Sequence, residues 1–359
     1  MNDVIIPEGP LRAMGAALLA ATGVPAETAN LVADSLVAAN LRAVDSHGVQ
    51  LLGFYIDQIR ASNFDVHARG RVASEIGGSM TYDAENGIGQ LTASICSDHA
   101  ARLAQQHGIG IVTARECNHF GAAAYWAQRI AKHGLLSLVV CNASPLVAPW
   151  QGKEARFGTN PICVAVPGPN TWLLDMATTT VAMGKIYKAS LSGVEDIPAG
   201  WGMDSEGVPT TKTADVMQGG LLMPLGGYKG SGLALLVEIL CAVLSGGAMS
   251  SEVGGLRLQG RPMRVSHFFM GIDIERFMPV PVFVERMQSL IDLVKQSAPA
   301  KGYDEVLVAG EPEWRAEELR RKNGIPLSAG VWRHLCEAAD SLGVPIPPVG
   351  GLDTTIVPT

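Results

Sequence analysis

The segment GIGIVTARECNHFGAAAYWAQRIAKHGLLSLVVCNA, residues 108–143, decides the fold class. It begins with an apolar run typical of a strand, continues as an amphipathic helix from residue 122, and ends in a second apolar run. A strand, a helix and a strand in this order predict an α/β fold. At the joint before the helix, Asn118 and His119 precede Phe120 and Gly121. Asn118 and His119 either cap the helix and fill a turn, or they face a ligand.

The rest of the chain continues this alternation. Residues 7–62 show helical periodicity, whereas strand-like runs follow within 71–89, 161–178 and 263–274. Further helices are expected at 91–107, 231–245, 281–297 and in the C-terminal tail. Because neither end of the chain has a strand pattern, we expect residues 1–72 and 300–359 to pair as one helical domain. Residues 73–299 are then expected to form the α/β domain.

The composition argues against several classes of partner. The 359 residues are 47% hydrophobic and 17% charged, which is typical of a folded globular protein. The net charge is 27 − 34 = −7, so a nucleic-acid partner or an anionic membrane surface is not expected. The most apolar helical segment, residues 232–247, contains Glu238 and is shorter than the roughly 20 residues that span a bilayer.

The cysteines and the N-terminus indicate a cytoplasmic protein. The chain begins MNDVIIPEGPLRAMG, which lacks the basic and apolar regions of a signal peptide. No CxxC, HExxH or HxH pattern occurs, so neither a disulfide framework nor a metal site is expected. Reduced thiols are therefore predicted at the cysteine positions 96, 117, 141, 163, 241 and 336.

The glycine-rich motifs do not match the common nucleotide-binding fingerprints. Two Gly-x-Gly runs, at 87–92 and 108–113, lack the third glycine and the later acidic residue of a Rossmann site. The run GGYKGSG, residues 226–232, is not a P-loop, because the sequence Gly-Lys-Ser/Thr does not occur in it. Lys229 nevertheless lies at the start of an apolar helix, where free N–H groups and a cation could hold an anion. The alternative is a solvent-exposed lysine.

Three further polar stretches lie between predicted elements. Ser46 and His47 in DSHGV (45–49) lie between two helices. A histidine whose tautomer is fixed by a neighbouring hydroxyl or carboxylate suits proton transfer near neutral pH. Thr159 in FGTNP (157–161) and Asp175 in DMAT (175–178) lie at strand ends, where they either line a cleft or only form turns. Single motifs of this kind do not assign a function.

The ordered series of motifs is more specific than any one of them. It resembles the malate/L-lactate dehydrogenase family that is distinct from the Rossmann lactate and malate dehydrogenases. The resemblance extends from the first helices to ELRRKNGIPL at 318–327. It is carried by DSHGV, NHFGAA, NASPLVAP, FGTNP, DMAT, IPAGWGMDSEGVPTT, GGYKGSGLALLVEIL and HFFMGIDIERF.

The resemblance implies both a fold and a cofactor. This family binds NAD or NADP on its own α/β fold with a large mixed sheet, so residues 73–299 are expected to bind the cofactor. It also includes ureidoglycolate, sulfolactate, diketogulonate and piperideine-2-carboxylate oxidoreductases. The sequence does not decide between NAD and NADP.

The resemblance also implies individual site residues. Ser46 and His47 match a Ser-His pair near the substrate, and His119 matches a histidine assigned to proton transfer in some members and to cofactor contact in others. Arg42 and Thr159 are expected to bind the substrate. A loop at residues 273–277 is expected to close over the cofactor near the interface of a homodimer. The implied cofactor-binding residues are His119, Phe120, Gly121, Ala122, Asp175, Met176, Ala177, Lys229, Gly230 and Arg276.

The sequence departs from the family pattern at two positions. Many members have an arginine three residues after the glycine of Ser-His-Gly, where it can bind a carboxylate, and this chain has Leu51 there. Arg42 or Arg60 would have to substitute, or the substrate head group differs. The cyclic-imine reductases have an aspartate where this chain has Lys185, which disfavours imine reduction.

We therefore expect an NAD(P)-dependent oxidoreductase that interconverts a small malate- or lactate-like 2-hydroxy acid and its 2-oxo acid. His47 is expected to be the acid/base, and His119 is expected to contact the nicotinamide. The alternatives are a cyclic-imine carboxylate reductase, a ureidoglycolate-type dehydrogenase and a non-catalytic small-molecule binder.

Overall fold

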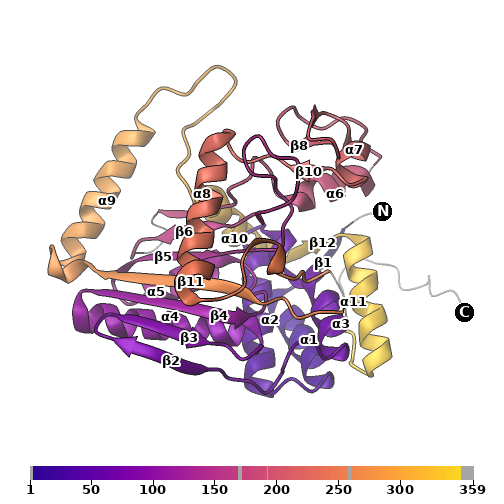
Figure 1. Ribbon diagram of the computed structural model, residues 1–359, viewed down its shortest axis with the longest axis horizontal. Coiled ribbons are helices and arrows are strands. Elements are labelled where there is room, and N and C mark those ends of the chain that lie inside the picture. The colour runs from indigo at the N-terminus through magenta and orange to yellow at the C-terminus, as the bar shows by residue number, and fades with distance from the viewer. Residues whose placement is uncertain (1–2, 169–171, 192, 258–259, 349–359) are drawn as a thin grey trace, which may run out of the picture.

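The computed structural model of the chain describes residues 3–168, 172–191, 193–257 and 260–348, and a mixed seven-stranded sheet forms its centre (Figure 1). The strands lie side by side in the order β2-β3-β4-β11-β5-β6-β7. Only β3 and β4 are parallel neighbours, and α4 connects them. The strands are β2 (Arg71–Ile76), β3 (Ser79–Asp83), β4 (Ile109–Cys117), β5 (Leu135–Cys141), β6 (Ile162–Ala165), β7 (Leu173–Met176) and β11 (Val265–Asp273).

This arrangement confirms the predicted α/β class with a large mixed sheet in place of a Rossmann fold. The strand expected at 263–274 is β11, and it lies between β4 and β5 although it follows them late in the chain. It is antiparallel to both neighbours, and His267 pairs with Ala114 on one side and Cys141 on the other. Its first five residues are all buried, because helices cover both faces of the sheet at this point.

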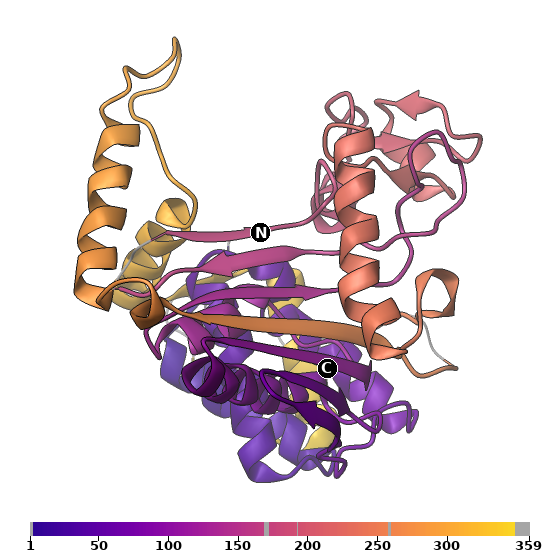
Figure 2. The ribbon, with the colours of Figure 1, turned by 60° about the vertical axis from the view of Figure 1, so that its left-hand side comes forward.

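The helices form layers on the two faces of the sheet. Figure 2 shows α4 and α5 against one face and α8 standing on the other. The N-terminal helix α2 packs on α4, so it forms an outer layer. The helices are α1 (Glu8–Ala21), α2 (Ala26–Leu41), α3 (Leu52–Arg60), α4 (Gly89–His107), α5 (Ala123–Ala131), α6 (Met183–Leu191), α7 (Thr213–Met217), α8 (Tyr228–Glu238), α9 (Val280–Lys295), α10 (Glu311–Asn323) and α11 (Ala329–Leu342).

The two ends of the chain pack together, as expected, but not through helices alone. Strand β1 (Val4–Ile6) pairs with β12 (Ile325–Leu327) in a small antiparallel sheet. The expectation that the ends contain no strand was therefore wrong, because three residues are too few to show strand alternation. Helix α11 packs on α1 and α3. One buried cluster joins these helices to the sheet, and the domain boundaries expected near residues 72 and 300 stay a prediction.

A smaller unit follows β7. It contains α6, α7 and a three-stranded sheet of β8 (Gly202–Met203), β9 (Pro209–Thr210) and β10 (Leu221–Leu222). Ile186 and Val216 are among the buried residues of its own apolar cluster. Among the helices described, none has the length and apolar character needed to cross a membrane.

Candidate active site

The polar stretches singled out in the sequence meet at one edge of the large sheet. Strands β4, β5 and β7 end at this edge, whereas β6 and β11 begin there, as the pairing registers show. A cavity of about 1010 Å³ opens at this edge. The segment 42–51 between α2 and α3, helix α6, and residues within 251–257, 261–263 and 307–313 complete its walls. Ligand sites commonly lie at strand ends and have volumes of about 300–1,000 Å³.

The turn that carries Ser46 and His47 is fixed from two sides. These residues form a 3-10 turn, Asp45–His47, after α2. The buried Asn40 of α2 donates to Asp45 Oδ1 at 2.6 Å and accepts from the Val49 N–H at 2.8 Å. Arg320 of α10 pairs with Asp45 at 2.7 Å. Both ends of the chain therefore hold His47 in place.

Hydrogen bonds to the loop before α4 hold the Asn118–His119 segment in place. The Asn118 amide donates to the carbonyl oxygens of Asn86 and Gly87 at 2.9 and 2.8 Å. A Cβ on Gly89 would lie 2.2 Å from the Asn118 carbonyl oxygen and 2.3 Å from that of His119. This glycine therefore permits close backbone packing, and no residue of the Gly87–Ile88–Gly89 run lines the cavity. Asn118 is a structural clamp, and His119 faces the cavity.

His119 presents a defined ring nitrogen to the cavity. The Gly121 N–H donates to His119 Nδ1 at 3.2 Å, so this nitrogen carries no proton. The Tyr55 hydroxyl lies 2.7 Å from the same nitrogen and accepts from Gln90 Nε2 at 2.9 Å. Tyr55 consequently donates to Nδ1, which leaves the proton of neutral His119 on Nε2. Neutral His119 is therefore an N–H donor.

His47 and His119 lie on the same wall. Their rings are nearly parallel, at 16°, with centroids 5.8 Å apart. The Ser46 hydroxyl lies 3.0 Å from His47 Nδ1 and orients that ring. Burial lowers the pKa of His119 to about 3, and the charges of His47, His267 and Arg257 add to the effect. Burial also lowers the pKa of His47, and the charge of Arg257 lowers it further.

A third histidine, His267, lines the cavity from β11. Its ring stacks on Phe120 with centroids 4.4 Å apart, and the side chain is fully buried. Burial lowers the pKa of His267 to about 3, which the Asn118 backbone offsets in part. His267 begins the motif HFFMGIDIERF, but the sequence did not predict a role for it.

We expect the free energy of unfolding to fall as the pH drops from about 6.5 toward 3. An unfolded histidine binds a proton with a pKa near 6.5. Folded His267, with a pKa of about 3, does not bind it until much lower pH. Unfolding therefore takes up protons within this window, and stability is lost as the pH decreases.

The variant His267→Phe isolates this contribution, because it keeps a ring against Phe120 and removes the titrating group. Between about pH 6 and 4, the wild-type slope should exceed the variant slope by about 1.4 kcal/mol per pH unit. Urea unfolding at several pH values measures both slopes. Equal slopes would contradict the prediction.

Asp175 and Arg42 form the other end of the cavity. The Ala124 N–H at the start of α5 donates to Asp175 Oδ2 at 3.1 Å. Enclosure by protein raises the pKa of Asp175 to about 6, although the Ala124 hydrogen bond and the Arg42 charge act in the opposite direction. Arg42 is buried, and its Nη1 lies 3.9 Å from Glu317 Oε2, which is too far for a hydrogen bond. Within the described residues, Nε and Nη1 of Arg42 have no hydrogen-bond partner.

The structure brings most of the predicted site residues together. Lys229 and Gly230, at the start of α8, and Arg276, after β11, do not line this cavity in the described chain. Lys229 is exposed, whereas Gly230 is buried. Arg60 bonds to Ser341 and also lies outside the lining. The predicted residues that do line the cavity are Arg42, Ser46, His47, His119, Phe120, Gly121, Ala122, Thr159, Asp175, Met176 and Ala177.

Sequence reasoning missed three residues near the histidines: Tyr55, Tyr187 and Arg257. Tyr55 lies behind His119, whereas Tyr187 and Arg257 line the cavity. Each stands alone in its helix or loop, so no local pattern marks it. At the two positions of departure, Leu51 lines the cavity and Lys185 is exposed outside the lining. Within the described residues, no cluster of three or more metal-binding side chains occurs.

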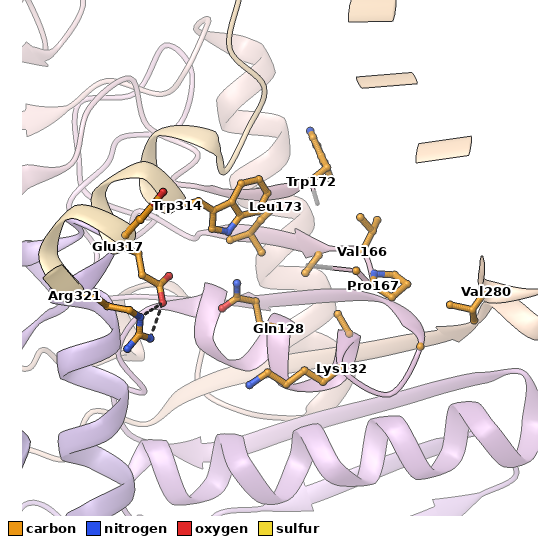
Figure 3. Close-up of a pocket in the computed structure, with 15 residues that line it drawn as sticks. Gln128, Lys132, Val166, Pro167, Trp172, Leu173, Val280, Trp314, Glu317 and Arg321 are labelled. Carbon is orange, nitrogen blue, oxygen red and sulfur yellow. Dashed lines mark hydrogen bonds and ion pairs between the residues drawn. The ribbon is translucent and has the colours of Figure 1, made fainter. Parts of the chain in front are cut away.

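A second cavity, of about 800 Å³, lies on the other side of Leu173, which lines both (Figure 3). Trp172 and Trp314 contribute aromatic walls, and Arg321 pairs with Glu317 at 2.7 Å. None of the described residues that line it is a histidine or a cysteine. The histidine-lined cavity is therefore the candidate active site.

Comparisons with known proteins identify the family and agree with the fold. The family model for malate/L-lactate dehydrogenase matches residues 6–336. Malate dehydrogenase of Pyrococcus horikoshii is 40% identical over 351 residues, which cover 96% of this chain and 97% of that protein. A solved structure of malate dehydrogenase from Pyrococcus horikoshii matches with a TM-score of 0.89 at 38% identity, covering 96% and 97% of the two chains. L-sulfolactate dehydrogenase of Methanocaldococcus jannaschii is 34% identical over 325 residues, which cover 90% and 93%. The chain belongs to the malate/L-lactate dehydrogenase family of oxidoreductases.

Proposed function

We propose that this enzyme uses NAD or NADP to interconvert a small malate- or lactate-like 2-hydroxy acid and its 2-oxo acid. The observation that carries the proposal is the pair of nearly parallel imidazoles, His47 and His119, on one wall of the 1010 Å³ cavity. Oxidation of a carbinol removes a hydride from carbon and a proton from oxygen. A histidine beside the reacting carbon suits the second task.

The other end of the cavity fits a dinucleotide. The buried guanidinium of Arg42 has two nitrogens without a hydrogen-bond partner among the described residues, and it fits an anionic group such as a phosphate. The start of α5 offers backbone N–H groups to the same region, and Asp175 can accept hydrogen bonds from ribose hydroxyls. Arg42, which the sequence analysis placed at the substrate, therefore fits the cofactor better. When bound, the nicotinamide supplies or accepts the hydride at its C4 carbon.

The histidines divide the proton chemistry between them. In the oxidative direction, neutral His47 takes the proton of the substrate hydroxyl, and in the reductive direction its imidazolium returns that proton. His119 has a pKa too low to store a proton near neutral pH, so it acts as a neutral donor from Nε2. Its N–H stabilises the substrate oxygen or the carboxamide of the nicotinamide. Thr159 lines the cavity and orients the substrate.

We further propose that Lys229 contacts the phosphate side of the cofactor from the rim of the cavity. A Cβ on Gly230 would lie 2.6 Å from the Thr178 carbonyl oxygen, so this glycine lets α8 approach the segment after Ala177. Arg276 lies beyond the far end of β11, paired with Asp273 at 3.3 Å. It does not line the cavity of its own chain, and we propose that it contacts the cofactor bound to a second chain.

We infer that this second chain is another copy, which makes the enzyme a homodimer. Helix α9 stands away from the rest of the molecule in Figures 1 and 2, and none of its residues is buried. Leu290 and Leu293 on α9 are 54% and 65% exposed, and Leu236 on α8 is 45% exposed. Exposed apolar surface of this extent marks protein interfaces. Sedimentation equilibrium should give twice the chain mass of 37.7 kDa.

We propose a cytoplasmic location, supported by the cysteines. All six are free thiols, and Cys336 is the one that is partly exposed. Thiols stay reduced in the cytosol.

The test of the function is an assay at 340 nm with purified enzyme, NADH or NADPH, and a panel of 2-oxo acids. Pyruvate, oxaloacetate and their longer homologues should be reduced faster than piperideine-2-carboxylate. A strong preference for the cyclic imine would overturn the hydroxy-acid assignment in favour of imine reduction. An absence of turnover with every compound would favour a binding protein or a substrate outside the panel.

A further inference from the structure

Arg257 is an exposed residue that lines the same cavity as the histidines. It follows a buried segment, Val253–Leu256, after the 3-10 turn Ser250–Glu252. The carbonyl of Leu256 accepts a hydrogen bond from the buried Gln58 of α3 at 2.9 Å. This contact anchors the backbone next to Arg257 on the helix that also carries Tyr55 and Phe54.

The guanidinium of Arg257 lies between two aromatic rings. Its Cζ is 5.0 Å from the ring centroid of Phe54 on α3 and 4.8 Å from that of Tyr187 on α6. Each contact is favourable because a cation is attracted to the face of an aromatic ring. Contacts with aromatic faces favour one orientation of a planar guanidinium without using its N–H groups.

Arg257 lacks an anionic partner. Across residues 3–168, 172–191, 193–257 and 260–348, it takes part in no ion pair with Asp or Glu. Most arginines elsewhere in this chain do pair, for example Arg320 with Asp45 at 2.7 Å. A guanidinium that is held in place, lines a cavity and has no carboxylate beside it is suited to bind the carboxylate of a ligand.

The position of Arg257 distinguishes it from the other arginines of the cavity. It lines the cavity together with His47 and His119, and its positive charge lowers the pKa of both histidines. Arg42 instead acts on Asp175 at the opposite end. Arg261 donates to the Val253 carbonyl at 2.9 Å and so fastens the loop.

We propose that Arg257, clamped between Phe54 and Tyr187, binds the carboxylate of the 2-oxo or 2-hydroxy acid. This inference rests on the proposed function and names the residue that selects acids over neutral ketones and alcohols. It also explains how the cavity can recognise an acid although Leu51 lines the wall where an arginine would otherwise serve. A bidentate contact from Arg257 would orient the acid against the two histidines.

The test compares Arg257→Met with Arg60→Met, which removes the same charge from outside the cavity. Pyruvate is the substrate, because it has a single carboxylate. Arg257→Met should raise the KM for pyruvate about 10- to 100-fold, as expected for a lost charge-assisted contact. The KM for NADH or NADPH should change less than about 2-fold. Arg60→Met should leave both values unchanged.

A binding measurement keeps the two proposals separable. Oxamate, an unreactive isostere of pyruvate, is titrated calorimetrically into the enzyme with bound NADH or NADPH. Its Kd should rise by the same factor in Arg257→Met. If the wild type binds oxamate but reduces no 2-oxo acid, the proposed function fails while the Arg257 assignment is still tested. An unchanged Kd for oxamate in Arg257→Met would overturn the Arg257 assignment alone.

Two further variants test the aromatic clamp. Tyr187→Phe keeps the ring and should leave the KM for pyruvate within about 2-fold, whereas Tyr187→Leu should raise it about 3- to 10-fold. Thermal unfolding of each variant shows whether it is folded. If Arg257→Met is not folded, Arg257→Lys replaces it in the test. Equal KM values for the two Tyr187 variants would overturn the proposed clamp.

Discussion

His47→Ala is expected to lower kcat for pyruvate reduction by about 10²- to 10⁴-fold, the usual contribution of a general acid–base group. The Kd for NADH or NADPH should stay nearly unchanged. His47 is oriented by Ser46 and lies in a turn that Asn40 and Arg320 clamp, so its ring is positioned in advance of substrate binding. His119, with a pKa of about 3, is a poor store for the proton that reduction requires.

His119→Ala is expected to act mainly on cofactor binding, because His119 is a fixed neutral donor. His133→Ala is a matched control, since His133 is exposed in the turn after α5. Stopped-flow kinetics and fluorescence titration with NADH or NADPH measure kcat and Kd for the three variants. If His119→Ala abolishes turnover with normal cofactor binding while His47→Ala does not, the two roles are reversed.

The sequence predicted those parts of the site that lie on contiguous motifs. His119 lies two residues after β4 and Asp175 lies within β7, and the pairing of β4, β11, β5, β6 and β7 brings these strand ends to one edge. Ends of strands in one sheet meet by geometry, so a polar residue at each of them predicts a shared cleft. His47 was found because Ser-His-Gly interrupts two helical patterns.

The remaining parts depend on contacts between distant segments. The insertion of β11 between β4 and β5 brings His267 to Phe120, and no local pattern specifies this order. Arg257 shows no signal in the sequence, because its function depends on Phe54 from α3 and Tyr187 from α6. The three-residue strand β1 forms because it pairs with β12 from the other end of the chain.

The Gly-x-Gly run at 87–89 shows that glycine spacing alone does not identify a nucleotide-binding loop. Gly89 follows β3 and begins α4, which leads to the parallel strand β4, so a dinucleotide loop would occupy the same topological place. In this chain the backbone of Asn118 and His119 covers that glycine. The loop therefore packs against the Asn118–His119 backbone and leaves no room for a phosphate at Gly89. A substitution at Gly89 therefore tests how precisely the Asn118–His119 segment must be positioned.

Gly89→Ala is expected to lower kcat/KM by about 100-fold, although the side chain touches neither substrate nor cofactor. The added Cβ would meet two backbone oxygens at 2.2 and 2.3 Å, so the Asn118–His119 joint must move. A displacement of about 1 Å in a catalytic group can cost a factor of about 10². The same strain should lower the free energy of unfolding by about 1–3 kcal/mol.

Gly9→Ala on α1 is the matched control, because a Cβ at Gly9 meets nothing within 4 Å. It should raise stability by about 0.5–1 kcal/mol through helix propensity and leave kcat/KM unchanged. Gly89 also begins a helix, so propensity alone would make both substitutions stabilising. The prediction is supported if Gly89→Ala lowers the free energy of unfolding, Gly9→Ala raises it, and only Gly89→Ala loses activity. The contact with the His119 backbone then outweighs the gain in helix propensity at Gly89. A stabilised and fully active Gly89→Ala enzyme would mean that the joint tolerates displacement, and His119 would then need no fixed position for turnover.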